Sequence, residues 1–89
     1  MFSWDEAKNE HNQRKHGISF EAATLVFEDP MHITRQDRIE NGEQRWQTVQ
    51  SLLLIAHTWR EAGNGTEHIR LISARRATKL ERKIHEQST

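Results

Sequence analysis

The sequence predicts an α+β domain with two N-terminal helices, an antiparallel sheet of about four strands and a C-terminal helix. Apolar residues recur at helical spacing near both ends of the chain. Between them, short apolar runs are separated by the turn signals Asn41-Gly42 and Gly63-Asn64-Gly65. Helices grouped apart from strands favour α+β over alternating α/β. With 89 residues, we expect one domain spanning 1–89.

The first helix is expected to begin after Asp5 or Ser3 and to run to about His16, where Gly17 ends it. Its apolar face is thin and comprises Trp4, Ala7 and His11. A second helix begins after Ser19 and stops at Glu28-Asp29-Pro30. Its apolar stripe contains Phe20, Ala23 and Phe27, widened by Leu25 and Val26. The final helix is predicted from the spacing of Ala77, Leu80 and Ile84.

Strands are predicted over 32–35, 45–49, 52–59 and 67–74, and residues 2–4 form a short edge strand. The 52–59 segment is apolar on both faces, so it is expected to be central. In 67–74 apolar residues occur at both odd and even positions, so alternation does not show which side of this strand faces the core.

Composition excludes several classes of function. There is no cysteine, hence no disulfide framework, thiolate nucleophile or cysteine-bound metal. The longest apolar run, Leu52–Ala56, is far shorter than the ~18 residues of a membrane span. The first residues, MFSWDEAKNE, lack the apolar region of a signal peptide. We therefore expect a soluble cytoplasmic protein without membrane contact.

The zero net charge hides an asymmetry. Residues 1–43 carry five Lys/Arg against nine Asp/Glu, whereas residues 44–89 carry eight against four. A basic C-terminal half indicates a surface for a polyanion, although a charged segment is also typical of a solvated face. The basic residues concentrate at Arg70, Arg75, Arg76, Lys79, Arg82 and Lys83.

The sequence resembles the BrnT family of toxins over nearly its whole length. The N-terminal half of the match comprises Trp4-Asp5, Lys8, Asn12, Lys15-His16-Gly17-Ile18-Ser19-Phe20, Ala23 and Val26-Phe27. The remainder comprises Arg45, Trp46, Thr48, His57-Thr58, Ile69-Arg70-Leu71-Ile72-Ser73-Ala74-Arg75, Ala77 and Glu81-Arg82. The resemblance implies a RelE-like fold, RNA cleavage, and inhibition by a co-encoded antitoxin, usually a ribbon-helix-helix DNA-binding protein. Departures from the family pattern are the short Gln50-Ser51 turn, the long 61–66 connection, and His85 in place of a frequent tyrosine.

RNA cleavage without a metal uses the substrate 2′-OH as nucleophile and needs cations for the charge that develops on phosphorus. Arg75 is our candidate clamp, with an ion pair to Glu81 as its structural alternative. Arg60 is expected to neighbour Arg70 or Arg75 if the last two long strands pair antiparallel. Because close cations repel, such a group favours a bound anion.

Proton-transfer candidates each have a structural alternative. Lys15 and His16 end the first helix, where cations also stabilise the helix dipole. His57 is a candidate general base beside Arg60, or else a half-buried histidine bonded to backbone. Glu81 either draws the 2′ proton or pairs structurally with its neighbours. Further RNA contacts are assigned to Arg76, Lys79 and Lys83, and Trp59 either stacks a base or belongs to the core.

No metal or cofactor is predicted, because His11, His32 and His68 fit no ligand spacing. The leading hypothesis is therefore a ribonuclease toxin that acts on RNA and is bound by an antitoxin. A second hypothesis is an inactive module of the same fold that binds RNA or a partner. A third, a DNA-binding regulator, rests on the basic final helix alone.

Overall fold

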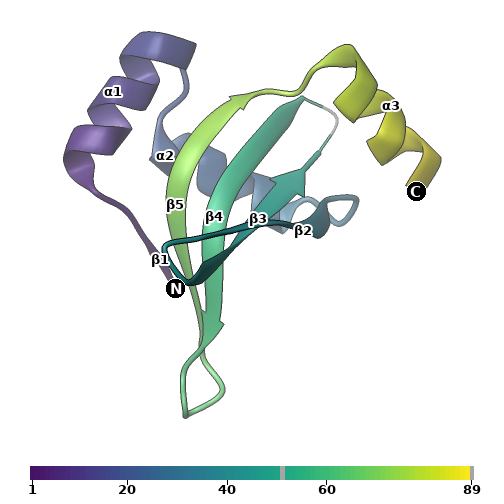
Figure 1. Ribbon diagram of the computed structural model, residues 1–89. Helices are drawn as coiled ribbons and strands as arrows, with labels where there is room; N and C mark the ends of the chain where they lie inside the picture. Colours follow the sequence, from purple (N-terminus) through teal and green to yellow (C-terminus); the bar gives the residue numbers. More distant parts are fainter. Residues whose placement is uncertain (51, 89) are drawn as a thin grey trace.

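The computed structural model describes residues 1–50 and 52–88, and it confirms the α+β class (Figure 1). One sheet has the strand order β1-β5-β4-β3-β2. Neighbouring strands are antiparallel except β1, which pairs parallel with β5. In chain order the elements are β1 (Phe2–Ser3), α1 (Glu6–His16), α2 (Phe20–Ala23), η1 (Thr24–Glu28), β2 (Ile33–Glu40), β3 (Glu43–Val49), β4 (Leu53–Glu61), β5 (Glu67–Arg76) and α3 (Lys79–Ser88).

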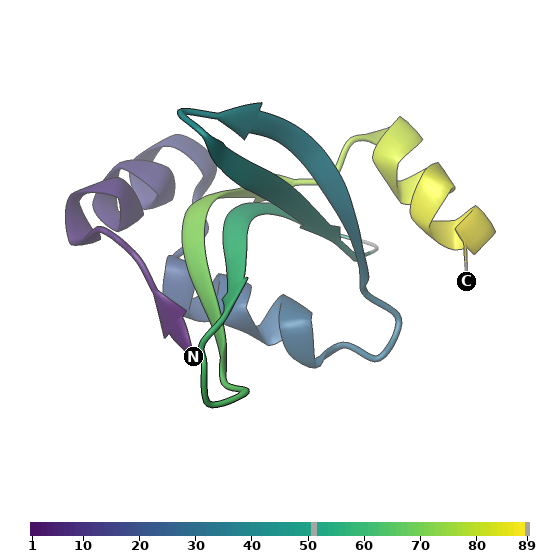
Figure 2. The same ribbon diagram turned by 60° about the horizontal axis from the view of Figure 1, so that its bottom comes forward.

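The helices occupy different sides of this sheet. Figures 1 and 2 show α1 beside β5, α2 and η1 against the sheet, and α3 standing apart at the other end of the molecule. The core lies between α2–η1 and strands β4 and β5. Its buried members are Phe20, Ala23, Val26, Ile55, Leu71 and Ala74. As predicted, β4 is central, with β5 on one side and β3 on the other.

The caps of α1 follow the sequence prediction. The Asp5 carboxylate accepts from the Ala7 amide at 2.8 Å, and Gly17 ends the helix with a φ of 72°. The predicted apolar face is wrong, because Ala7 and His11 are exposed. The buried positions of this helix are two asparagines, Asn9 and Asn12.

These asparagines join α1 to the rest of the fold by hydrogen bonds. The Asn12 amide donates to the Ala74 carbonyl at 2.8 Å and accepts from the Ala74 amide at 3.1 Å. The Asn12 side chain therefore forms the two hydrogen bonds with Ala74 that a neighbouring strand would form, at a point on β5 beyond the two residues that pair with β1. Asn9 accepts from the Phe20 amide at 2.8 Å and donates to Glu21. The helix is thus held by satisfied buried amides rather than by an apolar stripe.

The second helical segment changes its winding midway. Ser19 caps it as predicted, accepting from the Ala22 amide at 3.0 Å. From Thr24 the chain winds as a 3-10 helix, which alters which side chains face the sheet. Val26 is buried, but Leu25 is 62% exposed, so the prediction that Leu25 widens the buried stripe is wrong.

Three turns connect the long strands. Asn41 and Gly42 have φ values of 53° and 77°, the positive pair that a tight hairpin requires. This hairpin extends β2 to Glu40, well beyond the predicted end at residue 35. The turn before β4 includes Leu52, and the Gln50 side chain accepts from the Leu52 and Leu53 amides. Ser51, the other residue of the predicted short turn, lies outside the described residues.

A bulge in β5 explains why alternation could not assign its faces. Ala56 pairs with Ser73, but His57 pairs with Leu71, so Ile72 is an extra residue on β5. Leu71 and Ala74, three residues apart, are therefore both buried on the helix-covered face. Arg70 and Arg75, five residues apart, share the opposite face, because their partners Thr58 and Leu54 lie four residues apart on β4.

The predicted apolar face of α3 is not buried. Leu80 is 67% exposed and Ile84 is 38% exposed. The buried residue of this helix is His85, whose Nε2 donates to the Met31 carbonyl at 2.6 Å. This contact and the Arg75–Glu81 ion pair attach α3 to the body of the protein.

We predict that Asn12→Ala destabilises the protein by about 3 kcal/mol, because it leaves both polar backbone groups of Ala74 without a partner. Equilibrium urea unfolding measures this change. The matched control is His11→Ala, an exposed substitution on the same helix, with an expected effect within about 0.5 kcal/mol. Equal unfolding midpoints for the two variants would contradict the role given to Asn12.

Candidate functional site

The strand register places four arginines of β2, β3 and β5 on the sheet face opposite α2 and η1. Residues that pair directly across strands share a face, and residues two apart on an unbroken strand share it too. Arg75 aligns with Leu54 and Val49, and Arg35 aligns with Gln47 and Ala56. Arg70 aligns with Thr58, and Arg45 lies two residues from Gln47 on β3. We call the set Arg35, Arg45, Arg70 and Arg75 the arginine face.

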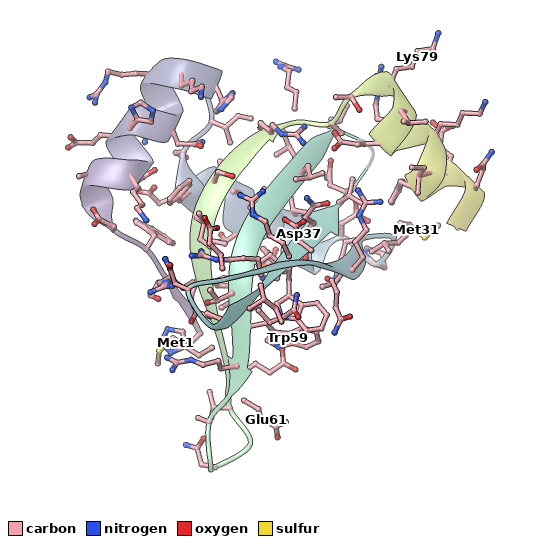
Figure 3. All side chains as sticks on the ribbon, in the orientation of Figure 1. Met1, Met31, Asp37, Trp59, Glu61 and Lys79 are labelled. Carbon is pink, nitrogen blue, oxygen red and sulfur yellow. The ribbon has the colours of Figure 1, made fainter. Side chains whose placement is uncertain are left out.

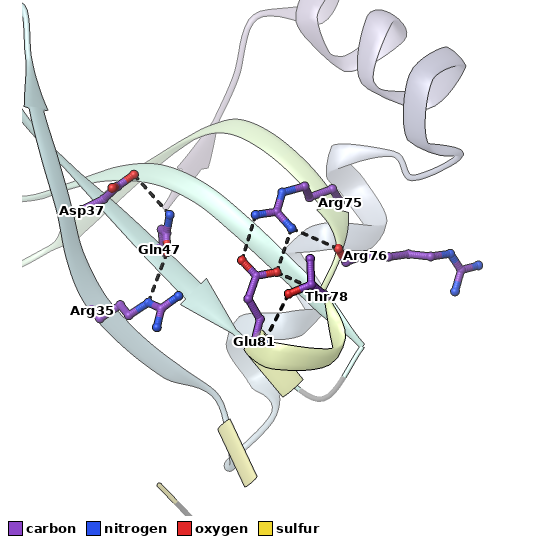
Figure 4. Close-up of polar contacts among 7 residues, drawn as sticks. All are labelled: Arg35, Asp37, Gln47, Arg75, Arg76, Thr78 and Glu81. Carbon is purple, nitrogen blue, oxygen red and sulfur yellow. Dashed lines mark hydrogen bonds and ion pairs between the residues drawn. The ribbon is translucent and has the colours of Figure 1, made fainter. Parts of the chain in front are cut away.

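Arg75 is held in place by Glu81 at the start of α3. The guanidinium donates to both Glu81 oxygens, at 2.8 and 2.9 Å, and also to the Arg76 carbonyl (Figure 4). Glu81 additionally accepts from the Thr78 amide at 2.8 Å, while the Thr78 hydroxyl accepts from the Glu81 amide. The structural alternative for Arg75, an ion pair with Glu81, is therefore present.

This contact decides the protonation of both groups. The hydrogen bonds from Arg75 are the largest cause that lowers the pKa of Glu81 to about 2. The same contact raises the pKa of Arg75 above its ordinary value, so the pair stays ionised at neutral pH. A carboxylate with so low a pKa is a weak base. The geometry favours the structural alternative for Glu81, in which it positions Arg75.

The other three arginines contact acceptors on the hairpin formed by β2 and β3. Arg35 donates to Gln47 at 3.2 Å, and Gln47 donates to Asp37 (Figure 4). Arg70 forms an ion pair with Glu43 at 2.8 Å. Arg45 lies 3.8 Å from Glu40, and its buried Nε has no hydrogen-bond partner among the described residues. A guanidinium has five N–H donors, so each arginine keeps donors for an anion.

Sequence reasoning missed Arg35 and Arg45 as members of this face. Both lie on strands whose extent and register are set by the Asn41-Gly42 hairpin. Alternation of Arg45 with Gln47 on β3 was the available signal. This alternation alone could not place Arg45 on the functional face, because the sequence does not show which face of β3 the helices cover.

Arg60 lies near Arg70 but far from Arg75, so of the two neighbours expected for Arg60 only Arg70 is close. Arg60 pairs with His68, six residues along β4 from Leu54, which is the partner of Arg75. At about 3.3 Å per residue this separation is about 20 Å. Alternation places Arg60 on the same face as Arg70, and the side chain of Arg60 has no hydrogen bond or ion pair with the described residues.

His57 lies on the other face of the sheet, and the expectation that it stands beside Arg60 is wrong. Its ring is 1% exposed and packs edge-on against Phe27 at 5.1 Å. Nδ1 donates to the Thr58 carbonyl at 2.9 Å, so Nε2 of the neutral ring accepts from the Thr48 hydroxyl at 2.7 Å. Burial lowers the pKa of this histidine. The contacts correspond to the structural alternative, a histidine bonded to backbone.

The remaining candidates lie away from the arginine face. Lys15 and His16 occupy the last turn of α1, beside β5, where they suit the helix dipole. Arg76 pairs with Leu53, whose neighbour on the helix-covered face is Ile55, and its guanidinium points away from Arg75 (Figure 4). Lys79 and Lys83 line a hollow of about 440 Å³ on α3. Trp59 is 40% exposed and contacts Trp46 edge-on at 5.2 Å.

Two kinds of feature are absent from the described part of the chain. Within 1–50 and 52–88, no group of three or more His, Asp or Glu side chains is arranged to hold a metal ion. Over the same residues, no helix combines the length and the apolar character that crossing a membrane requires.

The arrangement suits recognition of a phosphodiester. Planar guanidinium groups offer paired N–H donors that match phosphate oxygens, and they keep their charge at any physiological pH. Four such groups come from β2, β3 and β5, so they follow a surface rather than one loop. A surface of this kind fits a linear polyanion.

Comparison with known proteins agrees with this chemistry. A search of curated proteins gives no match. Residues 4–81 match the family model described as "Ribonuclease toxin, BrnT, of type II toxin-antitoxin system". The match covers all the strands from β2 to β5, the helices α1 and α2, and the part of α3 that contains Glu81. The chain therefore belongs to the BrnT family of ribonuclease toxins of type II toxin–antitoxin systems.

Proposed function

We propose that this toxin cleaves RNA on its arginine face, with no metal or cofactor, through attack of a ribose 2′-OH on the adjacent phosphorus. The observation that carries the proposal is the alignment of Arg35, Arg45, Arg70 and Arg75 on one face by strand register. The family assignment supplies the reaction class, endoribonuclease activity.

In this mechanism the 2′ oxygen forms a bond to phosphorus while the bond to the 5′ oxygen breaks. The 2′ proton leaves the nucleophile, and a proton reaches the departing 5′ oxygen. Negative charge increases on the two non-bridging oxygens as phosphorus becomes five-coordinate. Cations already in place stabilise that charge more than the charge of the bound substrate, which accelerates the step.

Arg75 is the proposed phosphate clamp, and Glu81 is its positioning residue. Paired hydrogen bonds to Glu81 fix the plane of the guanidinium before RNA binds. Fixing a flexible side chain in advance removes an entropy cost that binding would otherwise incur. Arg70 and Arg35 lie on neighbouring rows of the same face and are assigned to flanking phosphates, which hold the chain in register.

We further propose that the partner is a ribbon-helix-helix antitoxin, that the toxin acts in the cytoplasm on cellular RNA, and that residues 1–89 act as one domain of RelE-like fold. The charge asymmetry supports an antitoxin that contributes acidic or apolar residues to the basic surface.

A second candidate function, an inactive RNA- or partner-binding module, is favoured by one observation. Arg70 and Arg75 each already have a carboxylate partner, Glu43 and Glu81.

We predict that Arg75→Ala lowers the rate of RNA cleavage by about 100-fold or more, the usual effect of removing one transition-state donor. Single-turnover cleavage of a labelled RNA measures the rate. The matched control is Arg82→Ala, an exposed arginine on α3, which is expected to change the rate less than threefold. Equal rates for Arg75→Ala and the wild type would remove Arg75 from the site. RNA that binds yet stays intact with the wild type would select the inactive module.

Glu81→Gln separates positioning from proton transfer. The amide keeps an acceptor oxygen but loses the charge that fixes Arg75, so we predict a rate reduction of about tenfold. With a pKa of about 2, Glu81 is ionised across pH 4 to 9, and the shape of the pH–rate profile should not change. Cleavage rates of both proteins over that pH range test this. Loss of an acidic limb in the variant would instead identify Glu81 as the general base.

A further inference from the structure

A hollow of about 250 Å³ lies on the helix-covered face, beyond the end of η1. Phe27 and Trp59 contribute aromatic rings to it, and the buried His57 lies at its base. Its polar rim comes from His32, Thr34 and Glu67. We call this site, formed by Phe27, His32, Thr34, His57, Trp59 and Glu67, the aromatic hollow.

Internal contacts fix the aromatic side chains of the hollow. Phe27 contacts His57 and His32 at ring-centroid distances of 5.1 and 6.2 Å. Trp59 is held edge-on by Trp46 at 5.2 Å. Aromatic surfaces that are immobilised before binding suit a planar ligand, because stacking then orders few additional groups.

Several polar groups at the rim are available to a ligand. The Glu67 carboxylate and the Trp59 indole N–H have no hydrogen-bond partner among the described residues, and both residues are exposed. His32 Nδ1 donates to the Asp29 carbonyl at 2.5 Å, and Nε2 is the ring nitrogen left for a ligand. Thr34, in contrast, is engaged with Thr48 at 2.7 Å. The rim therefore offers the Glu67 carboxylate as an acceptor, the Trp59 N–H as a donor, and one nitrogen of His32.

We propose that the aromatic hollow takes one unstacked nucleobase of the RNA substrate, with Trp59 as the stacking surface. The inference rests on the proposed function, since it names how the same substrate is recognised beyond the phosphate site. The volume is below the roughly 300–1,000 Å³ typical of larger ligands and is suited to a single ring system. Bases splayed from single strands are commonly stacked on aromatic side chains and read along their edges.

The position of the hollow relative to the arginine face supports this occupant. Trp59 and Arg60 are consecutive on β4, so their side chains lie on opposite faces near the same end of the strand. Figure 3 shows Trp59 on the side of the molecule toward Glu61, far from Lys79 on α3. An RNA strand that passes around this end places a base against Trp59 and an adjacent phosphate near Arg60. This gives Arg60, which lies about 20 Å from Arg75 along the strand, a phosphate of its own.

The chemistry of the rim favours a base whose edge presents N–H donors. A carboxylate accepts paired hydrogen bonds from the ring N–H and the exocyclic amino group of guanine. Uracil has a ring N–H between two carbonyl oxygens, which would face the Glu67 carboxylate. We therefore infer a preference for guanine over uracil at this position.

Tryptophan fluorescence of the full-length toxin tests the proposal with 2′-O-methyl RNA oligonucleotides, which cannot be cleaved through the 2′ position. The oligonucleotides carry guanine, uracil or an abasic site at one central position in an otherwise constant sequence. The expected order of affinity is guanine, then uracil, then abasic. Trp59→Ala should weaken binding of the guanine oligonucleotide by about 5- to 100-fold and bring it close to the abasic value.

Two milder variants keep the test valid if Trp59→Ala fails to fold. Trp59→Phe keeps a stacking ring and should retain most of the affinity. Glu67→Gln, an exposed substitution, should reduce the preference for guanine over uracil at least threefold. Arg75→Ala serves as the control for the phosphate site and should lower affinity for all three oligonucleotides equally.

The outcomes separate this inference from the proposed nuclease activity. Equal binding of the three oligonucleotides by a wild-type toxin that cleaves RNA would overturn the base site and leave the nuclease proposal standing. Base-dependent binding with no cleavage of unmodified RNA would support the base site and overturn the nuclease proposal. Base-dependent binding that Trp59→Ala and Glu67→Gln both leave unchanged would place base recognition elsewhere and overturn the hollow.

Discussion

The extra residue in β5 is the constraint on which the site depends. Ile72 shifts the register between Ala56 and His57, and this shift changes the side on which later side chains emerge. It keeps Leu71 and Ala74 together in the core while Arg70 and Arg75 share the opposite face. Without the bulge, both pairs would be split, because their members are three and five residues apart, and this would bury an arginine and expose an apolar side chain. Core packing and the arrangement of the arginine face therefore both require the bulge in β5.

Opposite faces of this sheet carry different chemistry because few apolar residues are available. A domain of this size buries a small core, and the six residues of the core cluster all lie on one side. On the arginine face Val49 and Leu54 are also buried, and hydrogen bonds supply further attachments. Asn12 attaches α1 to β5, and the Arg75–Glu81 pair and His85 attach α3. The residue that would contact phosphate is thus also part of what holds the C-terminal helix, so binding and helix position are physically coupled.

Local signals in the sequence predicted most of the fold. Asp5, Ser19 and Gly17 cap helices where expected, the Asn41-Gly42 hairpin forms, and the apolar run from Leu53 gives the central strand. Long-range properties were not predicted. The bulge at Ile72 depends on pairing with β4, and the burial of Asn12 depends on its hydrogen bonds to Ala74 in β5, 62 residues away. Exposure of Leu80 reflects where α3 docks, which periodicity alone does not contain.

The same distinction applies to the candidate site. Residue types indicated arginine chemistry and an ion pair between Arg75 and Glu81, because those groups are close in the chain. Only the strand register shows which arginines share a face. This explains why Arg35 and Arg45 were missed and why the sequence could not decide between Arg70 and Arg75 as the neighbour of Arg60. His57 was a catalytic candidate because it is an imidazole near a strand end. Its position along β4 places the side chain on the helix-covered face, in the core beside Phe27.

The most direct test of a phosphate-binding arginine face is NMR of the arginine Nε–Hε groups during titration with a 2′-O-methyl RNA oligonucleotide. We predict that the resonances of Arg35, Arg45, Arg70 and Arg75 shift together at the same RNA concentration, while those of Arg14 and Arg82 remain in place. Shifts confined to Arg82 and its neighbours on α3, with the four sheet arginines unmoved, would contradict it.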